Sequence, residues 1–172
     1  MVWRAPVITR MDEPFVGDER PMLEGFLDWH RASLLYKCAE LTAEQLAYRA
    51  IPPSHLSLLG LVRHLAEVER NYFRRRFRGE TVERLYWHPD IPDAAFEDID
   101  PGRAEADITA LISEWEACRQ AVADAPLDAT FTSNRWGEMS LRWIYLHIIG
   151  EYAHHNGHAD LLRERIDGRT GW

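Results

Sequence analysis

Apolar residues recur at helical spacing in four segments of the chain. In the clearest segment, they follow one another three or four residues apart, at Leu58, Leu61, Leu65, Val68 and Tyr72. Residues with this spacing share one face of a helix, which can then pack against a core. The same criterion predicts four long helices, over about 20–40, 55–78, 102–124 and 140–166.

Capping and turn residues bound these helices. Pro21 suits a first helical turn, and Gly79 suits the position just past a helix end. Ser140 is a good N-cap and Gly168 a good terminator, so the fourth helix has the best-defined limits. A shorter element is expected at Thr42–Tyr48.

Three irregular segments lie outside the helices. Residues 1–19 have no helical period and are expected to form a lead-in arm. Residues 80–101 form a long loop between the second and third helices, and loops of this length are often functional. Residues 127–139 form a turn-rich connection with a short strand at Ala129–Thr132. The chain is therefore predicted to be a single all-α domain over residues 1–172, with its four long helices packed as a bundle.

Composition narrows the class of protein. The chain is 46% apolar and 11% aromatic, which is enough for a packed core. Its formal net charge of −8 argues against a nucleic-acid binder. No apolar run approaches the roughly 18 residues needed to cross a bilayer, and the N-terminus has no apolar signal region. We therefore expect no membrane partner and a cytoplasmic location.

The cysteines and the basic residues bear on the cellular setting. Cys38 and Cys118 lie far apart and outside any metal-binding spacing, so they are expected to be reduced, partly buried thiols. Lys37 is the only lysine among 20 basic residues. Such a preference for arginine fits a high-GC genome and an actinobacterial-like composition.

The candidate chemistry lies in the fourth predicted helix. This helix contains a cluster of possible metal ligands: His147, Glu151, His154, His155 and His158. Residues four apart lie on one helix face, so three pairs can each reach a common point. Those pairs are His147 with Glu151, Glu151 with His155, and His154 with His158. Because burying so many titratable groups is costly, either most are exposed or some share a metal.

His64 offers a third ligand from the apolar face of the second helix. One ligand from this helix and two from the fourth leave positions open for water or substrate. Spacing alone does not decide which pair of the fourth helix takes part. Glu151 and His154 also form an E-x-x-H, as in di-iron bundles, although such sites need further carboxylates. A lone core histidine is also commonly a hydrogen-bonded filler.

Two longer motifs resemble a known superfamily. They are LVRHLAEVE at residues 61–69 and LHIIGEYAHHNGHADLLRE at residues 146–164. Both are similar to segments of the DinB-like superfamily of metal-binding four-helix bundles, which includes mycothiol-dependent maleylpyruvate isomerases and bacillithiol transferases. The resemblance extends roughly from Glu19 to the C-terminus. It implies a DinB-like four-helix bundle with an up-down-down-up or similar order.

The resemblance also implies a ligand set. In these families the metal is held by a His of the second helix and an H-x-x-x-H or E-x-x-x-H pair of the last helix. The final ligand precedes a short Gly-containing segment, which here follows His155. One divalent metal bound by His64, Glu151 and His155 is therefore implied. The other candidates, as groups that support these ligands or as alternative ligands, are His158, His154 and His147.

Two imidazoles and one carboxylate suit Zn²⁺ best, with Ni²⁺, Fe²⁺ or Mn²⁺ as alternatives. The resemblance implies a low-molecular-weight thiol such as mycothiol as co-substrate. The leading hypothesis is a metal-dependent thiol S-transferase or isomerase, with a metal-bound thiolate attacking a small electrophilic substrate. The alternatives are a non-catalytic metal-binding stress or sensor protein and a helical interaction module with incidental histidines. A monomer and a homodimer both stay open.

Overall fold

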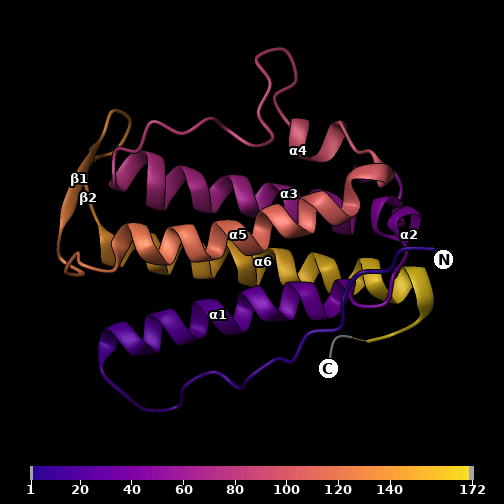
Figure 1. Cartoon of the computed structure of the whole chain (residues 1–172), viewed down its shortest axis with the longest axis horizontal. Coiled ribbons are helices and arrows are strands. Elements are labelled where there is room, and N and C mark those ends of the chain that lie inside the picture. Colours follow the sequence, from indigo (N-terminus) through magenta and orange to yellow (C-terminus); the bar gives the residue numbers. More distant parts are fainter. Residues whose placement is uncertain (1, 171–172) are drawn as a thin grey trace.

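Four long helices form the body of the protein. The computed structural model describes residues 2–170. The long helices are α1 (Glu19–Cys38), α3 (Leu58–Glu69) with its continuation η1 (Arg70–Phe77), α5 (Ala104–Val122) and α6 (Leu141–Asp167). Figure 1 shows them side by side, with α1 and α6 running in one direction and α3 and α5 in the other. Helix α1 packs against α6, and α3 packs against both α5 and α6.

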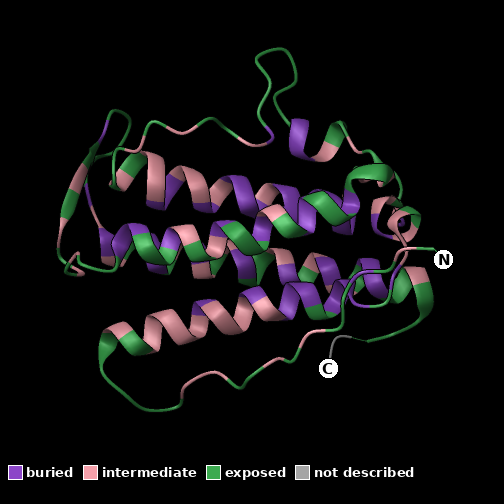
Figure 2. Ribbon diagram, in the orientation of Figure 1, coloured by how far each residue is buried: buried purple, intermediate pink, exposed green. Residues whose placement is uncertain are grey.

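Shorter elements connect the long helices. They are α2 (Ala43–Ala47), α4 (Ala94–Glu97), the 3-10 turn η2 (Pro101–Arg103) and the strands β1 (Thr130–Ser133) and β2 (Gly137–Ser140). The chain is thus mostly helical, as predicted, with a small two-stranded sheet. In Figure 2 the buried residues follow the helix faces that meet one another, and the exposed residues follow the outer faces.

The antiparallel hairpin corrects the expectation of an all-α chain. Strand β1 starts one residue after the predicted start of the strand and pairs with β2, which was not predicted. Phe131 pairs with Met139 across the hairpin. The ring of Phe131 also lies edge-on to Phe77, with 6.0 Å between ring centroids. The hairpin therefore packs on the end of η1 through aromatic contact.

The second predicted helix differs from expectation at both ends. It begins at Leu58, because the Ser57 side chain accepts a hydrogen bond from the Gly60 amide and so caps the first turn. From Arg70 onward the helix is π-helical, and the Arg78 amide donates to the Phe73 carbonyl five residues back. A π-turn is wider than an α-turn, so it shifts which side chains share a face.

Polar side chains of α3 hold the loop at residues 80–101, which follows η1, against the helix. The Glu67 carboxylate accepts hydrogen bonds from the amides of Leu85 and Tyr86, at 2.6 and 3.1 Å. The buried Arg63 guanidinium donates to the carbonyl of Ala94 at 3.1 Å and also to that of Asp98. The long loop predicted at residues 80–101 is therefore an ordered cover over α3, and it contains α4.

A buried polar network links all four long helices. Arg31 of α1 donates through Nε to Oε1 of Glu69 on α3, at 2.9 Å. The Tyr152 hydroxyl on α6 donates to the same oxygen at 2.6 Å, and Nε1 of Trp115 on α5 donates to that hydroxyl at 2.9 Å. Burial raises the pKa of Tyr152 well above its ordinary value, so the hydroxyl keeps the proton it donates. The network fixes the rotation of each helix.

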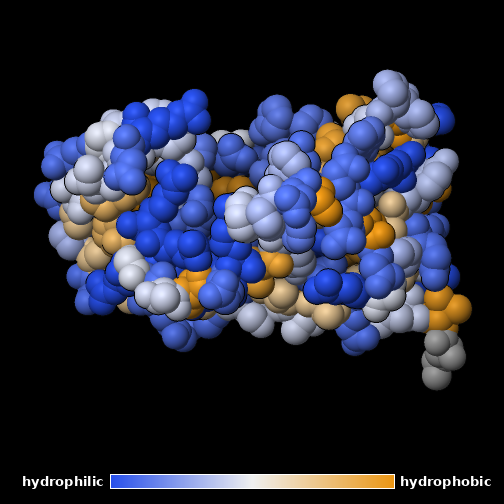
Figure 3. All heavy atoms as spheres, turned by 90° about the horizontal axis from the view of Figure 1, so that it is seen from above, coloured by the Kyte–Doolittle hydropathy of each residue, from blue (hydrophilic) through white to orange (hydrophobic). Residues whose placement is uncertain are grey.

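Seen from above, the face that carries the cover over α3 is largely hydrophilic, with small separate apolar patches (Figure 3). Within residues 2–170, no helix combines the length and the apolar character needed to span a membrane.

The network yields a prediction about stability. Tyr152→Phe removes one donor to Glu69 and should lower the free energy of unfolding by about 1–3 kcal/mol. Glu69→Leu leaves Arg31 buried without its main partner and should cost more, about 3–5 kcal/mol. Urea denaturation measures both. As a control, Arg142→Ala breaks the exposed pair with Glu19 and should change the midpoint little. Equal effects of all three variants would contradict the role of the network.

Candidate metal centre

The three implied ligands meet between α3 and α6. The ligand atoms of His64, Glu151 and His155 all lie within 4.8 Å of one another. Nε2 of His64 is 3.5 Å from Oε2 of Glu151, and Nε2 of His155 is 3.7 Å from the same oxygen. The three side chains are between 11 and 30% exposed, so a small molecule can reach them.

Helix geometry and the buried network together bring the side chains of His64, Glu151 and His155 close to one another. Glu151 and His155 lie four residues apart and therefore on one face of α6. Tyr152, the residue after Glu151, points into the core, where its hydrogen bond to Glu69 fixes the rotation of α6. Since Glu69 belongs to the same helix as His64, one contact sets how both helices face each other.

The donor atoms have the free lone pairs that a metal needs. Nε2 of His64 is buried and forms no well-aligned hydrogen bond among the described residues, and the carboxylate of Glu151 is its polar neighbour at 3.5 Å. A buried nitrogen without a well-aligned hydrogen bond is rare in a folded protein and calls for a ligand. His155 places Nδ1 at 3.3 Å from Nδ1 of His158 and leaves Nε2 facing Glu151. This donor set fits one divalent cation, with His158 orienting the His155 ring.

Burial and neighbouring groups keep these residues in their coordinating forms. Burial, followed by the nearby His64, lowers the pKa of His155 to about 4, so its ring is neutral at pH 7. The contact with His64 is the main cause that lowers the pKa of Glu151, so its carboxylate is ionised. Metal coordination requires these deprotonated forms.

A second histidine trio shares one member with this cluster. The ligand atoms of His154, His155 and His158 also lie within 4.8 Å of one another. All three come from one helix, α6, and His154 is exposed. This trio has no carboxylate, whereas the first joins two helices and includes the buried Nε2 of His64.

His147 lies at the other end of the cluster. Its Nε2 is 3.9 Å from Oε1 of Glu151, close enough to influence the carboxylate. Its ring stacks on Trp143 with 4.6 Å between centroids and an interplanar angle of 13°. Tyr72 also contacts the ring, at 4.7 Å. His147 is thus held mainly by aromatic neighbours.

The structure places further residues at the candidate metal centre that the residue spacing in the sequence did not indicate. Phe96 of α4 covers the cluster, with its ring 5.0 Å from that of His64 and 6.5 Å from that of His155. Beside His64, a cleft of about 220 Å³ opens between α3 and the loop that covers it. Polar side chains in its wall include Asn71, Arg84 and Asp93. The only sequence signal for this cleft is the unusual length of the loop.

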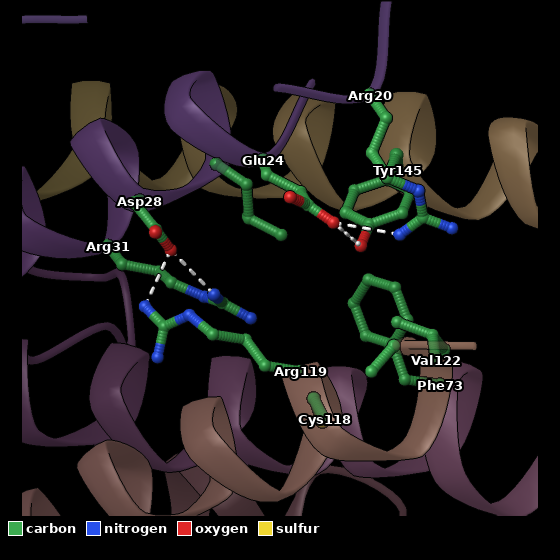
Figure 4. Close-up of a pocket in the computed structure, with 11 residues that line it drawn as sticks. Arg20, Glu24, Asp28, Arg31, Phe73, Cys118, Arg119, Val122 and Tyr145 are labelled. Atoms are coloured by element: carbon green, nitrogen blue, oxygen red, sulfur yellow. Dashed lines mark hydrogen bonds and ion pairs between the residues drawn. The ribbon is translucent and has the colours of Figure 1, made fainter. Parts of the chain in front are cut away.

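Another cleft, of about 420 Å³, lies between α1, η1, α5 and α6 (Figure 4). Its charged side chains pair with one another. Asp28 accepts from Arg31 at 2.8 Å and from Arg119 at 2.7 Å, and Glu24 accepts from Arg20 at 2.8 Å. Only the pair of Arg119 with Asp28 bridges α5 and α1, since the other two lie within α1. None of the three implied ligands lines the cleft.

Both cysteines are free and buried, as predicted. Burial raises the pKa of the Cys38 and Cys118 thiols, so both stay protonated at neutral pH. Neither protein thiol is therefore a ready nucleophile at neutral pH.

Comparison with known protein families shows which family the chain belongs to. Residues 22–168 match the family described as Mycothiol-S-transferase. The chain belongs to the mycothiol S-transferases. This family is part of the DinB-like superfamily, so the resemblance is confirmed. Membership implies a mycothiol-related S-transferase. None of the curated proteins compared with the chain matches it.

The depressed pKa of His155 yields a prediction for this mycothiol S-transferase in its metal-free form. Between about pH 6.5 and pH 4 the unfolded chain binds a proton that the folded chain does not, so stability should fall on acidification. His155→Gln removes this contribution, on the order of 1–2 kcal/mol after solvent screening, and should flatten the decline.

Urea denaturation in the presence of a chelator, at several pH values, measures the effect. His88→Gln removes an exposed histidine and serves as the control, with the wild-type decline expected. A decline that is identical in the wild type and in His155→Gln would show that His155 is not the group responsible.

Proposed function

We propose that this protein is a metal-dependent S-transferase that joins mycothiol to a small electrophile. The observation that carries the proposal is the meeting of His64, Glu151 and His155 within 4.8 Å, with His64 also lining an open cleft. Family membership supports the thiol and the reaction type. The proposal includes a DinB-like four-helix bundle in the up-down-down-up order and a cytoplasmic location.

His64, Glu151 and His155 would hold one divalent cation, Zn²⁺ in first place. Such a cation would lower the pKa of a bound thiol, so that the sulfur is nucleophilic at neutral pH. The chain's own part is to supply neutral imidazoles and an ionised carboxylate. His158 orients the His155 ring, and Phe96 shields one side of the cluster from water.

The cleft beside His64 is suited to the thiol. Asn71, Arg84 and Asp93 offer hydrogen-bond donors and acceptors in its wall, which matches a polar, hydroxyl-rich molecule such as mycothiol. Because both protein thiols are buried and protonated, the transferred sulfur belongs to this molecule. The open cleft favours a transferase over a non-catalytic metal-binding stress or sensor protein, whose site would be closed.

The proposal makes a prediction about metal content. His64→Ala, Glu151→Ala and His155→Ala should each lower zinc affinity by more than about 100-fold, because each removes a direct ligand. His158→Ala should lower it about 10–100-fold, since His158 only orients a ligand. His147→Ala is the matched control and should retain zinc. Elemental analysis of the purified variants measures zinc content.

Activity is measured on the same samples. The metal-stripped wild type should lose mycothiol transfer, and added Zn²⁺ should restore it. Full zinc content in both His64→Ala and His155→Ala would show that the metal lies elsewhere. Undiminished transfer by the stripped protein would show that the reaction needs no metal.

A further inference from the structure

Beside the metal cluster, rings of η1 and α6 form an aromatic surface. Trp143 stacks on His147, whose Nε2 is 3.9 Å from Glu151. Tyr72 lies 5.8 Å from Trp143, measured between ring centroids. Trp143 is 37% exposed although it is one of the largest apolar side chains. The aromatic surface therefore begins at the cluster and is open to solvent.

Two arginines and an exposed tryptophan extend this surface toward the hairpin. The Arg76 guanidinium lies 5.0 Å from the ring of Tyr72 and 5.7 Å from that of Trp136, and Arg135 lies 4.9 Å from Trp136. Trp136 is 51% exposed. We call Tyr72, Trp136 and Trp143, with Arg76 and Arg135, the aromatic shelf.

The arginines of the shelf differ from Arg70 and Arg74 of η1 in their ion pairing. Arg70 and Arg74 both pair with the buried carboxylate of Glu114. Over residues 2–170, by contrast, neither Arg76 nor Arg135 forms an ion pair with a carboxylate. In a chain of net charge −8, two cations that contact only aromatic faces leave their positive charge available to a ligand.

Hollows beside Trp136 are large enough for a substituted ring. One, of about 410 Å³, lies between Trp136 and Trp143 and is bordered by Met139. A second, of about 370 Å³, lies on the side of Arg76 and Arg135. Small-molecule sites typically have volumes of a few hundred Å³ and combine aromatic walls with a few charged groups.

We propose that the aromatic shelf binds the second substrate of the transferase, an electron-poor aromatic ring with a leaving group that departs as an anion. This inference rests on the proposed S-transferase function. The electron-rich faces of the exposed Trp143 and Trp136 rings, which line the same hollow, stack favourably on an electron-poor ring. Arg76 and Arg135 stabilise the negative charge that develops on the ring substituents and on the leaving group.

The position of the shelf suits the reaction. A ring beside Trp143 lies close to His147, whose Nε2 is 3.9 Å from Glu151, and so lies near a thiol held at the cluster. The thiol sulfur forms a bond to the ring carbon that carries the leaving group. The bond from that carbon to the leaving group breaks, and the leaving group takes the electron pair. The thiol proton passes to solvent.

The test compares two electrophiles with the zinc-loaded full chain and mycothiol. The aromatic electrophile is 1-chloro-2,4-dinitrobenzene, and the compact aliphatic one is iodoacetamide. After subtraction of the uncatalysed rate, Trp143→Leu should raise KM for the aromatic electrophile about five- to tenfold. KM for iodoacetamide should change less than about twofold. Tyr48→Leu removes an exposed aromatic ring outside the shelf and serves as the matched control.

Zinc content and melting temperature show whether each variant is folded. If Trp143→Leu does not fold, Trp136→Leu in the exposed hairpin turn takes its place with the same expected result. An equal change in KM for both electrophiles, or no change for either, overturns the shelf as the site of the aromatic substrate.

Direct binding separates this inference from the proposed function. The unreactive probe 2,4-dinitroaniline should bind the wild type in isothermal titration calorimetry and bind Trp143→Leu at least about fivefold more weakly. This result would support the shelf even if the wild type transferred mycothiol to neither electrophile. No binding to the wild type overturns it. A wild-type dimer that Trp143→Leu dissociates, with no probe bound, would show that the surface contacts a second copy of the chain.

Discussion

The carboxylate of Glu69 is the constraint on which the arrangement of the helices depends. It is fully buried on α3, and there it accepts hydrogen bonds from Arg31 of α1 and Tyr152 of α6. Trp115 of α5 joins through the Tyr152 hydroxyl. An ionised group in a core is costly unless every lone pair is satisfied, so the four helices are held at rotations that satisfy it.

The position of the candidate metal centre follows from the hydrogen bonds of Glu69. When Tyr152 points to Glu69, the preceding residue, Glu151, is turned by about 100° around the axis of α6 and reaches His64 of α3. His64 lies five residues before Glu69 on the same helix. The loop held down by Arg63 and Glu67 then brings Phe96 over the ligands and opens a cleft beside them. The buried network around Glu69, the loop over α3 and the candidate metal centre are therefore linked through α3.

Sequence patterns predicted the helices well because amphipathic spacing and capping residues are local signals. Ser140 and Gly168 bound α6 within one residue of the prediction. The π-helix at Arg70–Phe77 was missed, since a wide turn changes hydrogen bonding without changing the apolar pattern. Strand β2 was missed because its Gly-Glu-Met-Ser sequence has little strand character, and pairing with β1 decides its conformation.

The site was predictable only in part. Helical spacing identified the ligand-rich face of α6 but left three pairs open, and only resemblance selected Glu151 with His155. Phe96, Trp143 and Tyr72 could not be assigned to the site, because their approach to the histidines depends on tertiary packing. The lack of a well-aligned hydrogen bond at Nε2 of His64 is likewise visible only in three dimensions.

The central claim is that a thiol binds directly to a metal held by His64, Glu151 and His155. It is tested most directly by replacing the metal with Co²⁺ and titrating the protein with mycothiol, with absorbance followed in the near ultraviolet. The account predicts a new sulfur-to-cobalt charge-transfer band that saturates at one thiol per metal and is absent from the His64→Ala variant. A cobalt spectrum that mycothiol leaves unchanged would contradict the claim.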